Sequence, residues 1–191
     1  MRKGQYARKT RETEVTAKVN LDGTGKTEID TGIKFLDHLL TSLGTHSLID
    51  INIKTTGDLR HHIAEDTAMV LGEALQKALQ LDKHITRFAS SNVPMDESLA
   101  TCSIDLGGRP YHIIDLALVN PMTEDMHNED ITHFMETFAI SLQANIHISV
   151  IYGSNDHHKA EAAFKALARC LREAIAIDTR RTDLPSSKGT L

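Results

Sequence analysis

Polar and apolar residues alternate along the first part of the chain, and alternation with a period of two is typical of half-buried β-strands. Within residues 5–20 the alternation is clearest from Val15 to Val19, where every second residue is apolar. The sequence LDGTG at residues 21–25 is a turn signal that leads into a second short segment at residues 26–31. The pattern therefore predicts a β-hairpin.

A helical pattern and then a strand pattern follow. Apolar residues recur at intervals of three and four between Ile33 and Leu43, which places them on one helix face, and Gly44 predicts the end of this helix. Isoleucines at positions 49, 51 and 53 alternate with polar residues, as in a half-buried strand, and a second helix is predicted from about residue 61 to residue 78. The first half of the chain is thus predicted as ββαβα.

The second half of the chain repeats this order. Its pattern predicts strands at residues 98–106 and 109–119, a helix at 129–144, a strand at 145–153 and a helix from 157 to about 176. The motif G-x-x-x-H-H-x-A-E, where x is any residue, occurs once in each half, at residues 57–65 and 153–161. The matching order and the matching motif indicate an internal duplication.

We therefore predict an α+β fold built from two ββαβα half-domains, residues 1–90 and residues 91–191. Helices should cover the sheets, and the halves should pack about a pseudo-twofold axis. The segment SSNVPMDE at residues 90–97 is the only plausible joint, and no stretch richer in Gly or Pro separates the halves. Tight packing of the two halves is expected.

Composition narrows the possible classes of protein. The 191 residues are 40% hydrophobic, which is enough to bury a core. Cys102 and Cys170 lack CxxC spacing and indicate neither a disulfide framework nor a thiolate zinc site. No apolar leader or run of roughly 18 apolar residues occurs, so a cytoplasmic protein without a membrane partner is expected. A net charge of -5, with 4% aromatic residues and no Trp, argues against a nucleic-acid partner.

Histidine is over-represented, with 11 residues, and imidazole is the commonest transition-metal ligand in proteins. Each HH pair begins a predicted helix. The first His and the Glu of the motif are four residues apart, so they share a helix face and can bind one ion. The second His points about 100° away and is expected to serve a different ion or a different role.

Each half also has a histidine in the helix upstream of its motif, namely His38 and His133. The candidates divide into two sites of three His and one Glu, and the duplication favours sites that draw on both halves. The candidate metal ligands are His38, His61, His62, Glu65, His133, His157, His158 and Glu161. A set without cysteine and with positions left for water suits Mn(II) first, then Fe, Co or Ni. A single HH pair is more often solvent-exposed, but two in register favour metal binding.

Further motifs run through nearly the whole chain: RKTRET, LDGTG, GIKFLDHLL, HHIAED, VPMDESLA, DLGGRPY, GSNDHHKAEAAFKALARCLREA and PSSKGTL. In this order they resemble the imidazoleglycerol-phosphate dehydratase family. The resemblance implies a lyase of histidine biosynthesis that dehydrates imidazole glycerol phosphate, a small phosphate substrate, to imidazole acetol phosphate. It also implies two Mn(II) ions per active site and a homo-oligomer of twenty-four subunits with active sites between protomers.

The resemblance assigns roles to individual residues. It implies one ion bound by His38, His62, His157 and Glu161, and another bound by His61, Glu65, His133 and His158. Glu12 is implied as a general acid/base, beside Glu65 and Glu161 as further catalytic groups. Substrate contacts are implied for Glu12, His38, His46, Arg87, Arg109, Lys165, Ser187, Lys188 and Gly189. The last three lie in a tail that is expected to close over the substrate. Taken alone, most of these residues would be surface charges.

One position departs from the family pattern. Members commonly have an acidic residue immediately before the first HH pair, within a longer loop, whereas this chain has Arg60 there. The departure puts in doubt the support of the loop and the packing of a neighbouring subunit, while all eight ligands are kept. Asp66, directly after Glu65, either orients a ligand or simply suits the first turn of a helix.

Two other functions fit parts of the pattern. A dinuclear metal hydrolase would need carboxylates that bridge two close ions, and the His-rich ligand set argues against it. A metal-storage or structural metal protein built as a helical bundle would show similar repeated motifs. The predicted strands argue against a bundle, and Arg87 and Arg109 suit a phosphate, for which storage has no use.

Overall fold

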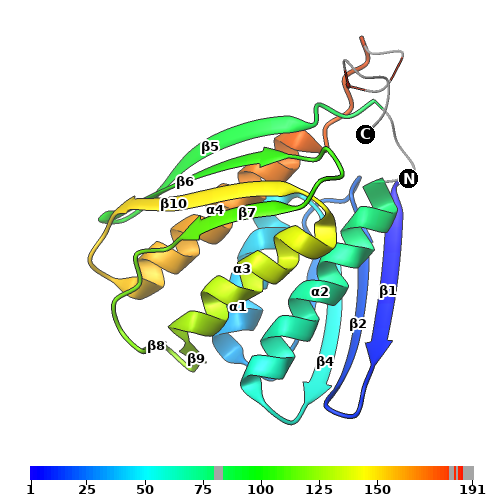
Figure 1. The fold of residues 1–191 in the computed structure, drawn as a ribbon. Coiled ribbons are helices and arrows are strands. Elements are labelled where there is room, and N and C mark those ends of the chain that lie inside the picture. The colour runs from blue at the N-terminus through cyan, green and yellow to red at the C-terminus, as the bar shows by residue number, and fades with distance from the viewer. Residues whose placement is uncertain (80–83, 181–182, 184, 187–191) are drawn as a thin grey trace.

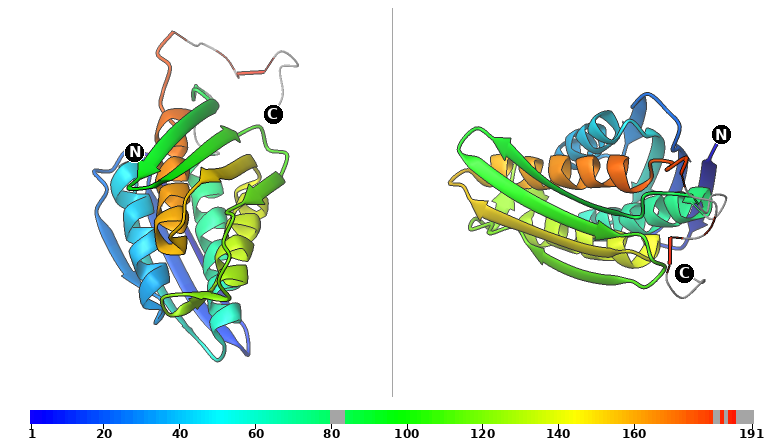
Figure 2. Two further views of the ribbon diagram at one scale, coloured as in Figure 1. Left: turned by 90° about the vertical axis from the view of Figure 1, so that its left-hand side faces the viewer. Right: turned by 90° about the horizontal axis from the view of Figure 1, so that it is seen from above.

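Four long helices lie between two four-stranded sheets in the computed structural model, which describes residues 1–79, 84–180, 183, 185 and 186 (Figure 1 and Figure 2). The helices are α1 (Lys34–Ser47), α2 (Arg60–Leu79), α3 (Asn128–Leu142) and α4 (Asp156–Ala174). The first two helices cover one sheet, and the other two cover the second sheet. The two helix layers meet where α2 packs on α3 and α1 packs on α4. No helix in the described ranges is long and apolar enough to span a membrane.

The first sheet has the strand order β1-β2-β4-β3. Its strands are β1 (Lys3–Lys9), β2 (Thr13–Asn20), β3 (Thr27–Asp30) and β4 (Asp50–Gly57). Strand β2 is antiparallel to both β1 and β4, whereas β3 is parallel to β4. The sheet thus combines a hairpin with a parallel strand that enters α1.

The predicted hairpin between residues 5–20 and residues 26–31 is wrong. Residues 5–20 belong to two strands, β1 and β2, because the chain turns at Thr10, whose hydroxyl oxygen accepts hydrogen bonds from the N–H groups of Glu12 and Thr13. The turn after Asn20 does not return the chain beside β2, since β3 pairs with β4 instead. An ST-type turn without Gly or Pro gives a weak signal in the sequence.

The second sheet repeats this arrangement in the order β5-β6-β10-β7. Its strands are β5 (Phe88–Met95), β6 (Ser98–Asp105), β7 (Tyr111–Asp115) and β10 (Asn145–Tyr152). The directions match those of the first sheet, with β10 antiparallel to β6 and parallel to β7. Two short strands, β8 (Met122–Thr123) and β9 (Met126–His127), form a separate hairpin before α3. The predicted α+β fold of two duplicated ββαβα halves is therefore confirmed, with one additional strand at the start of each half.

The predicted joint at residues 90–97 is mostly strand, because it belongs to β5, and the predicted boundary between residues 90 and 91 lies inside that strand. An edge strand needs few apolar residues, and none of the residues of β5 is fully buried. An edge position also tolerates Pro94, which has no N–H to donate. These features explain why the segment looks like a linker in the sequence.

Two glycines allow close packing of the helices. α1 continues past Gly44 to Ser47 instead of ending there, and a Cβ atom at residue 44 would lie 2.4 Å from Cγ2 of Thr27. A Cβ atom at Gly72 of α2 would lie 2.7 Å from Cβ of Ser141 on α3. The absence of side chains at these positions lets α1 approach β3 and lets α2 approach α3.

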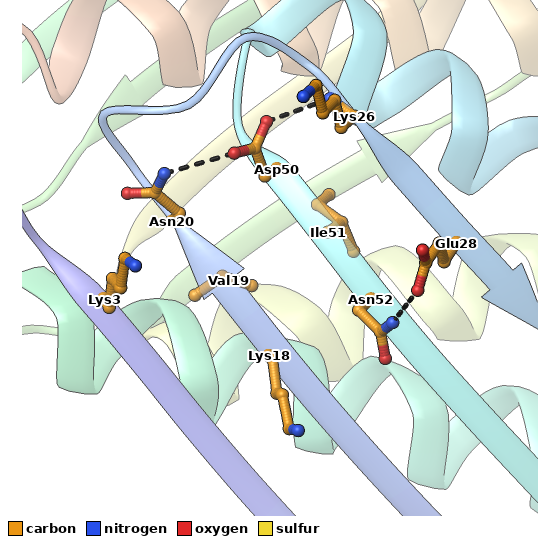
Figure 3. Close-up of a pocket in the computed structure, with 9 residues that line it drawn as sticks. All are labelled: Lys3, Lys18, Val19, Asn20, Lys26, Glu28, Asp50, Ile51 and Asn52. Carbon is orange, nitrogen blue, oxygen red and sulfur yellow. Dashed lines mark hydrogen bonds between the residues drawn. The ribbon is translucent and has the colours of Figure 1, made fainter.

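The outer faces of the two sheets differ in character. The outer face of the first sheet is charged and contains a hollow of about 360 Å³ bordered by Lys3, Lys18 and Lys26 (Figure 3). The outer face of the second sheet exposes three large apolar side chains, Phe88, Tyr111 and Ile113, among polar ones such as Ser103 and His147.

Candidate metal centre

The first group of candidate ligands, here called the His38 cluster, consists of His38, His157 and Glu161 and lies where α1 meets α4. The ligand atoms of the three residues all lie within 4.8 Å of one another. Nε2 of His38 is 3.0 Å from Oε2 of Glu161, and Nε2 of His157 is 3.3 Å from the same oxygen. The ring of Phe35 packs against the ring of His157, with 4.9 Å between their centroids. Three donors thus converge on a volume of the size that one ion needs.

Glu161 is the buried anion of the His38 cluster. Burial opposes its ionisation, but hydrogen bonds from Lys165 and His38 outweigh burial and lower the pKa of Glu161 to about 2. Nζ of Lys165 is 2.7 Å from Oε1 of Glu161, on the side of the carboxylate away from His38. Glu161 is therefore ionised at neutral pH, which is the form that binds a cation.

The second group, here called the His61 cluster, consists of His61, Glu65 and His133 and lies where α2 meets α3. Its ligand atoms also lie within 4.8 Å of one another. Nε2 of His133 is 3.5 Å from Oε1 of Glu65, and the rings of His61 and His133 stack with centroids 5.2 Å apart. Exchanging the two halves of the chain exchanges the two clusters. Each cluster therefore takes side chains from both halves.

The second histidine of each pair joins neither group of candidate ligands among the described residues. Nδ1 of His62 lies 2.8 Å from Oδ1 of Asp58, and Nδ1 of His158 lies 2.7 Å from Oε2 of Glu97. These hydrogen bonds are the main reason that the pKa of each imidazole is raised above its ordinary value. Within one chain, three residues of each predicted set of four ligands therefore lie together, and the fourth residue, His62 or His158, lies apart from them.

Local hydrogen bonds fix the start of α4 and with it the second HH pair. The side-chain oxygen of Asn155 accepts from the N–H groups of His157 and His158, at 2.9 and 3.4 Å. This is the cap that an Asn before a helix commonly provides. The helix therefore begins just before the HH pair and places His157 and Glu161, four residues apart, on one face.

Asp156 ties the start of α4 to the chain between β7 and β8. Its carboxylate accepts from the N–H groups of Val119 and Asn120, at 3.0 and 2.8 Å, and pairs with Nζ of Lys159 at 2.9 Å. Burial opposes ionisation, but the hydrogen bonds from Asn120, Lys159 and Val119 outweigh it and lower the pKa of Asp156 to about 2. The ionised carboxylate thus anchors the helix that carries two of the three residues of the His38 cluster.

Arg60 begins α2 and contacts the turn between β8 and β9. Its guanidinium donates to the backbone carbonyl of Asp125 and, at 3.1 Å, to the carboxylate of the same residue. That carboxylate also accepts from the N–H groups of Lys34 and Phe35 at the start of α1, at 3.0 and 2.9 Å. The residue that departs from the family pattern therefore has a partner in the other half, and it links the starts of α1 and α2.

Three of the predicted substrate or catalytic residues lie close to candidate ligands. Lys165 pairs with Glu161, and burial together with the nearby charge of Lys165 lowers the pKa of His46 at the end of α1. Oε2 of Glu12 is 3.9 Å from Nδ1 of His62, and its side chain is exposed. Lys165 thus contacts the His38 cluster, His46 lies within electrostatic reach of Lys165 and Glu161, and Glu12 lies near His62.

The other predicted substrate residues lie elsewhere. Arg87 is buried, and its guanidinium donates to Asp105, at 2.6 and 3.1 Å, and to the backbone carbonyl of Pro185 at 2.6 Å. These bonds leave two of the five guanidinium N–H groups for a further partner. Arg109 is exposed between β6 and β7. The remaining predicted residues, Ser187, Lys188 and Gly189, lie outside the described residues.

The sequence reasoning missed the carboxylates that contact the HH pairs through Nδ1, and one interpretation needs correction. Only Asp58, four residues before His62, has a helical spacing that signals the contact. The other three carboxylates, Glu97, Glu124 and Asp130, are between 33 and 69 residues from their histidines along the chain. Asp66 does not orient a histidine but accepts hydrogen bonds from the hydroxyl of Thr13 and from Nε of Arg8. It holds α2 to β1 and β2.

Together, the duplicated α+β fold and the two equivalent clusters of two His and one Glu define a class of protein with paired sites suited to divalent cations. Comparison with known proteins identifies the family within that class. Residues 31–171 match the family model of imidazoleglycerol-phosphate dehydratase. The chain belongs to the imidazoleglycerol-phosphate dehydratase family. Proteins of that name are hydro-lyases, and the chain is accordingly an enzyme.

Two relatives match this chain over its whole length. The imidazoleglycerol-phosphate dehydratase of Dehalococcoides mccartyi (strain CBDB1) is 47% identical over 191 residues, which are 100% of this chain and 97% of the relative. That of Methanothermobacter thermautotrophicus is 45% identical over 194 residues and covers 100% and 98% of the two chains.

Two crystal structures have the same fold. The structure of imidazoleglycerol-phosphate dehydratase from Staphylococcus aureus N315 superposes with a TM-score of 0.85 at 32% identity, covering 92% of this chain and 99% of that chain. The Pyrococcus furiosus enzyme, solved in complex with (S)-C348, superposes with a TM-score of 0.86 at 36% identity, covering 97% and 100%.

Proposed function

We propose that this enzyme catalyses the metal-dependent dehydration of imidazole glycerol phosphate to imidazole acetol phosphate in histidine biosynthesis. The observation that carries the proposal is the pair of His-His-Glu clusters in a chain of the dehydratase family. The free thiols of Cys102 and Cys170 are buried, which agrees with a reducing compartment, and we place the enzyme in the cytoplasm.

Each cluster fits one divalent transition-metal ion. The donors are imidazole nitrogens and carboxylate oxygens without thiolates, a set that suits Mn(II) first and then Fe, Co or Ni. Glu161 is ionised at neutral pH, so a cation does not have to displace a proton from it. The His38 cluster would hold one ion and the His61 cluster another. Each set of three donors leaves coordination positions for a fourth protein ligand and for substrate.

We propose that the fourth protein ligand comes from a neighbouring copy. His62 and His158 stand apart from the clusters of their own chain, and the Nδ1 atom of each faces a carboxylate. In a homo-oligomer, His62 would complete the His38 cluster of one neighbour and His158 the His61 cluster of another. We expect this assembly to contain twenty-four subunits.

The side chains around the clusters would divide the chemistry among them. Ions held by the His38 and His61 clusters would supply Lewis acidity, which stabilises negative charge on the imidazole ring of a substrate. Glu12 lies beside His62 and would enter the shared site with it, where its exposed carboxylate can move a proton at the side-chain carbon or hydroxyl. Lys165, Arg109 and the tail at residues 187–189 would hold the phosphate. Arg87, bound to the carbonyl of Pro185, would fix the approach of that tail.

Chelation and reconstitution test the proposal directly. The purified enzyme is stripped with a chelator, reconstituted with Mn(II) and supplied with imidazole glycerol phosphate, and imidazole acetol phosphate is measured. We expect turnover only with metal, loss of metal and turnover together in His61→Ala, and neither loss in the control Lys18→Ala, whose side chain is exposed on the outer face of the first sheet. Turnover by metal-free protein at the rate of the reconstituted enzyme would refute the metal mechanism.

A further inference from the structure

All four histidines of the two HH pairs share one feature, which is that Nδ1 faces a carboxylate. The Nδ1-to-oxygen pairs are His61 with Asp130 at 2.6 Å, His62 with Asp58 at 2.8 Å, His157 with Glu124 at 3.0 Å and His158 with Glu97 at 2.7 Å. The carboxylates come from four different places: the first turn of α3, the turn before α2, the β8–β9 turn and the β5–β6 turn. Coincident surface pairing does not explain one carboxylate on the same ring atom of every histidine.

We propose that Asp58, Glu97, Glu124 and Asp130 are positioning residues for metal binding. A carboxylate can only accept a hydrogen bond, so it holds the proton of a neutral imidazole on Nδ1 and leaves the lone pair on Nε2 for a cation. His157 shows the result, because Nδ1 faces Glu124 while Nε2 points at Glu161 of its cluster. The inference rests on the proposed metal dependence and adds the residues that fix the ligands in their binding form.

Glu97 shows that such a carboxylate is itself held in place. Its Oε1 atom accepts from the backbone N–H groups of Ser154 and Asn155, at 3.1 and 2.9 Å, while Oε2 faces His158. One side chain thus connects the β5–β6 turn, the loop before α4 and the imidazole. His158 joins no cluster of its own chain, and its Nε2 atom lies 3.5 Å from Oδ2 of the exposed Asp96. Glu97 therefore fixes both the loop before α4 and the direction in which His158 is presented.

The internal duplication explains why the two unclustered histidines have different partners. Glu12 immediately precedes β2 and Glu97 immediately precedes β6, so the two glutamates are equivalent positions. Glu97 contacts Nδ1 of its histidine directly, whereas Glu12 stays 3.9 Å from Nδ1 of His62 because Asp58 occupies that place. The position equivalent to Asp58 is Ser154, which has no carboxylate to place beside Nδ1 of His158. Asp58 therefore leaves Glu12 free for proton transfer, and Glu97 remains a positioning group.

Replacing one carboxylate by its amide gives a sharp test. In Glu97→Gln the amide oxygen keeps the two backbone N–H groups, so the NH2 group faces His158 and favours the tautomer whose proton is on Nε2, which leaves no lone pair on Nε2 for a metal ion. Titration of the stripped full-length protein with Mn(II), by calorimetry, should show one of the two sites per chain weakened by about 10- to 100-fold and the other unchanged. Asp58→Asn should weaken the other site by a similar factor.

The controls separate this inference from the proposed function. Glu129→Gln removes an exposed acid beside Asp130 in the same turn of α3 and should leave both sites as in the unchanged protein. Equal affinities in Glu97→Gln and the unchanged protein would overturn the positioning role, as would equal weakening of both sites, which indicates a general structural effect. If the unchanged protein binds two Mn(II) ions but yields no product, the proposed reaction fails while the positioning role stands.

Discussion

The two histidines of each HH pair occupy different environments although they are adjacent in sequence. Neighbouring side chains on a helix point about 100° apart. The first histidine therefore joins the Glu four residues later, as in His61 with Glu65, and the second is directed away to a carboxylate at the surface. At this scale, elementary helix geometry decides which residues can share an ion.

Glu12 provides a prediction at the residue scale. Glu12→Gln keeps the size of the side chain but removes the group that accepts a proton, whereas the ligands of both clusters are unchanged. We expect turnover to fall by about 10²- to 10⁴-fold while Mn(II) affinity and the size of the assembly stay constant. Steady-state rates and calorimetric titration of the same preparation check this. A variant with normal turnover would show that another group moves the proton.

The sequence predicts part of the site because helix spacing and repetition are visible in it. The pair of His61 with Glu65 follows from a spacing of four, and His133 follows from its place upstream of the second motif. The partner of His61 at Nδ1 does not, since Asp130 is 69 residues away and meets it only when α2 and α3 pack together. Contacts made by tertiary packing leave no periodic signal.

At the scale of elements, the starts of the helices set the positions of the candidate ligands. Asp125 binds the first N–H groups of α1 and the guanidinium of Arg60 at the start of α2. Asn155 caps α4, and Asp156 holds it to the β7–β8 connection. A shift of any of these helix starts would move a candidate metal ligand. We therefore expect the capping residues to affect stability and metal affinity together.

Asp156 gives a prediction for stability and its pH dependence. Its pKa is lowered to about 2 in the folded protein, so the ionised carboxylate stabilises the fold above about pH 4, and this stabilisation is lost as pH falls from about 4 to 2. Asp156→Asn leaves Lys159 buried without its anion and should lower the free energy of unfolding by about 3 kcal/mol at pH 7. Denaturant unfolding between pH 7 and pH 2 checks both effects. An unchanged stability at pH 7 would contradict this account.

The contact between α2 and α3 gives a second prediction for an element. Gly72→Ala improves the intrinsic helix propensity by roughly 1 kcal/mol, but the new Cβ atom would lie 2.7 Å from Cβ of Ser141 and 2.9 Å from the backbone nitrogen of Leu142. Overpacking of this kind costs about 1 to 3 kcal/mol, so we expect a net loss of stability. Thermal unfolding of the metal-free protein measures it, and a rise in Tm would show that the helices can separate without cost.

Periodicity in the sequence predicted the types of the elements better than it predicted which strands pair. The helices and the strand β4 were predicted near their observed positions because their apolar residues are regularly spaced. Strand β5 was missed because an edge strand with Pro94 and few apolar residues shows no such pattern. The pairing of β3 with β4 depends on α1 crossing between them, which a turn signal at residues 21–25 cannot reveal.

At the scale of the whole molecule, the duplication produces two equivalent but incomplete sites. Exchange of the halves converts the contact of α1 with α4 into the contact of α3 with α2, and with it one cluster into the other. Each cluster holds three of the four ligands expected for it, and the two remaining histidines, His62 and His158, lie apart from the clusters of the same chain. For each type of shared site, a single copy therefore contains both the three-residue cluster and the histidine that would complete the same cluster in a neighbouring copy.

Diffraction from crystals grown with Mn(II), recorded at the manganese absorption edge, tests this account most directly. We predict two anomalous peaks per chain, one bound by His38, His157 and Glu161 and the other by His61, Glu65 and His133. The fourth protein ligand should be His62 at the first and His158 at the second, each from a neighbouring copy. An absence of peaks at the clusters, or ions whose ligands all come from one chain, would contradict the account.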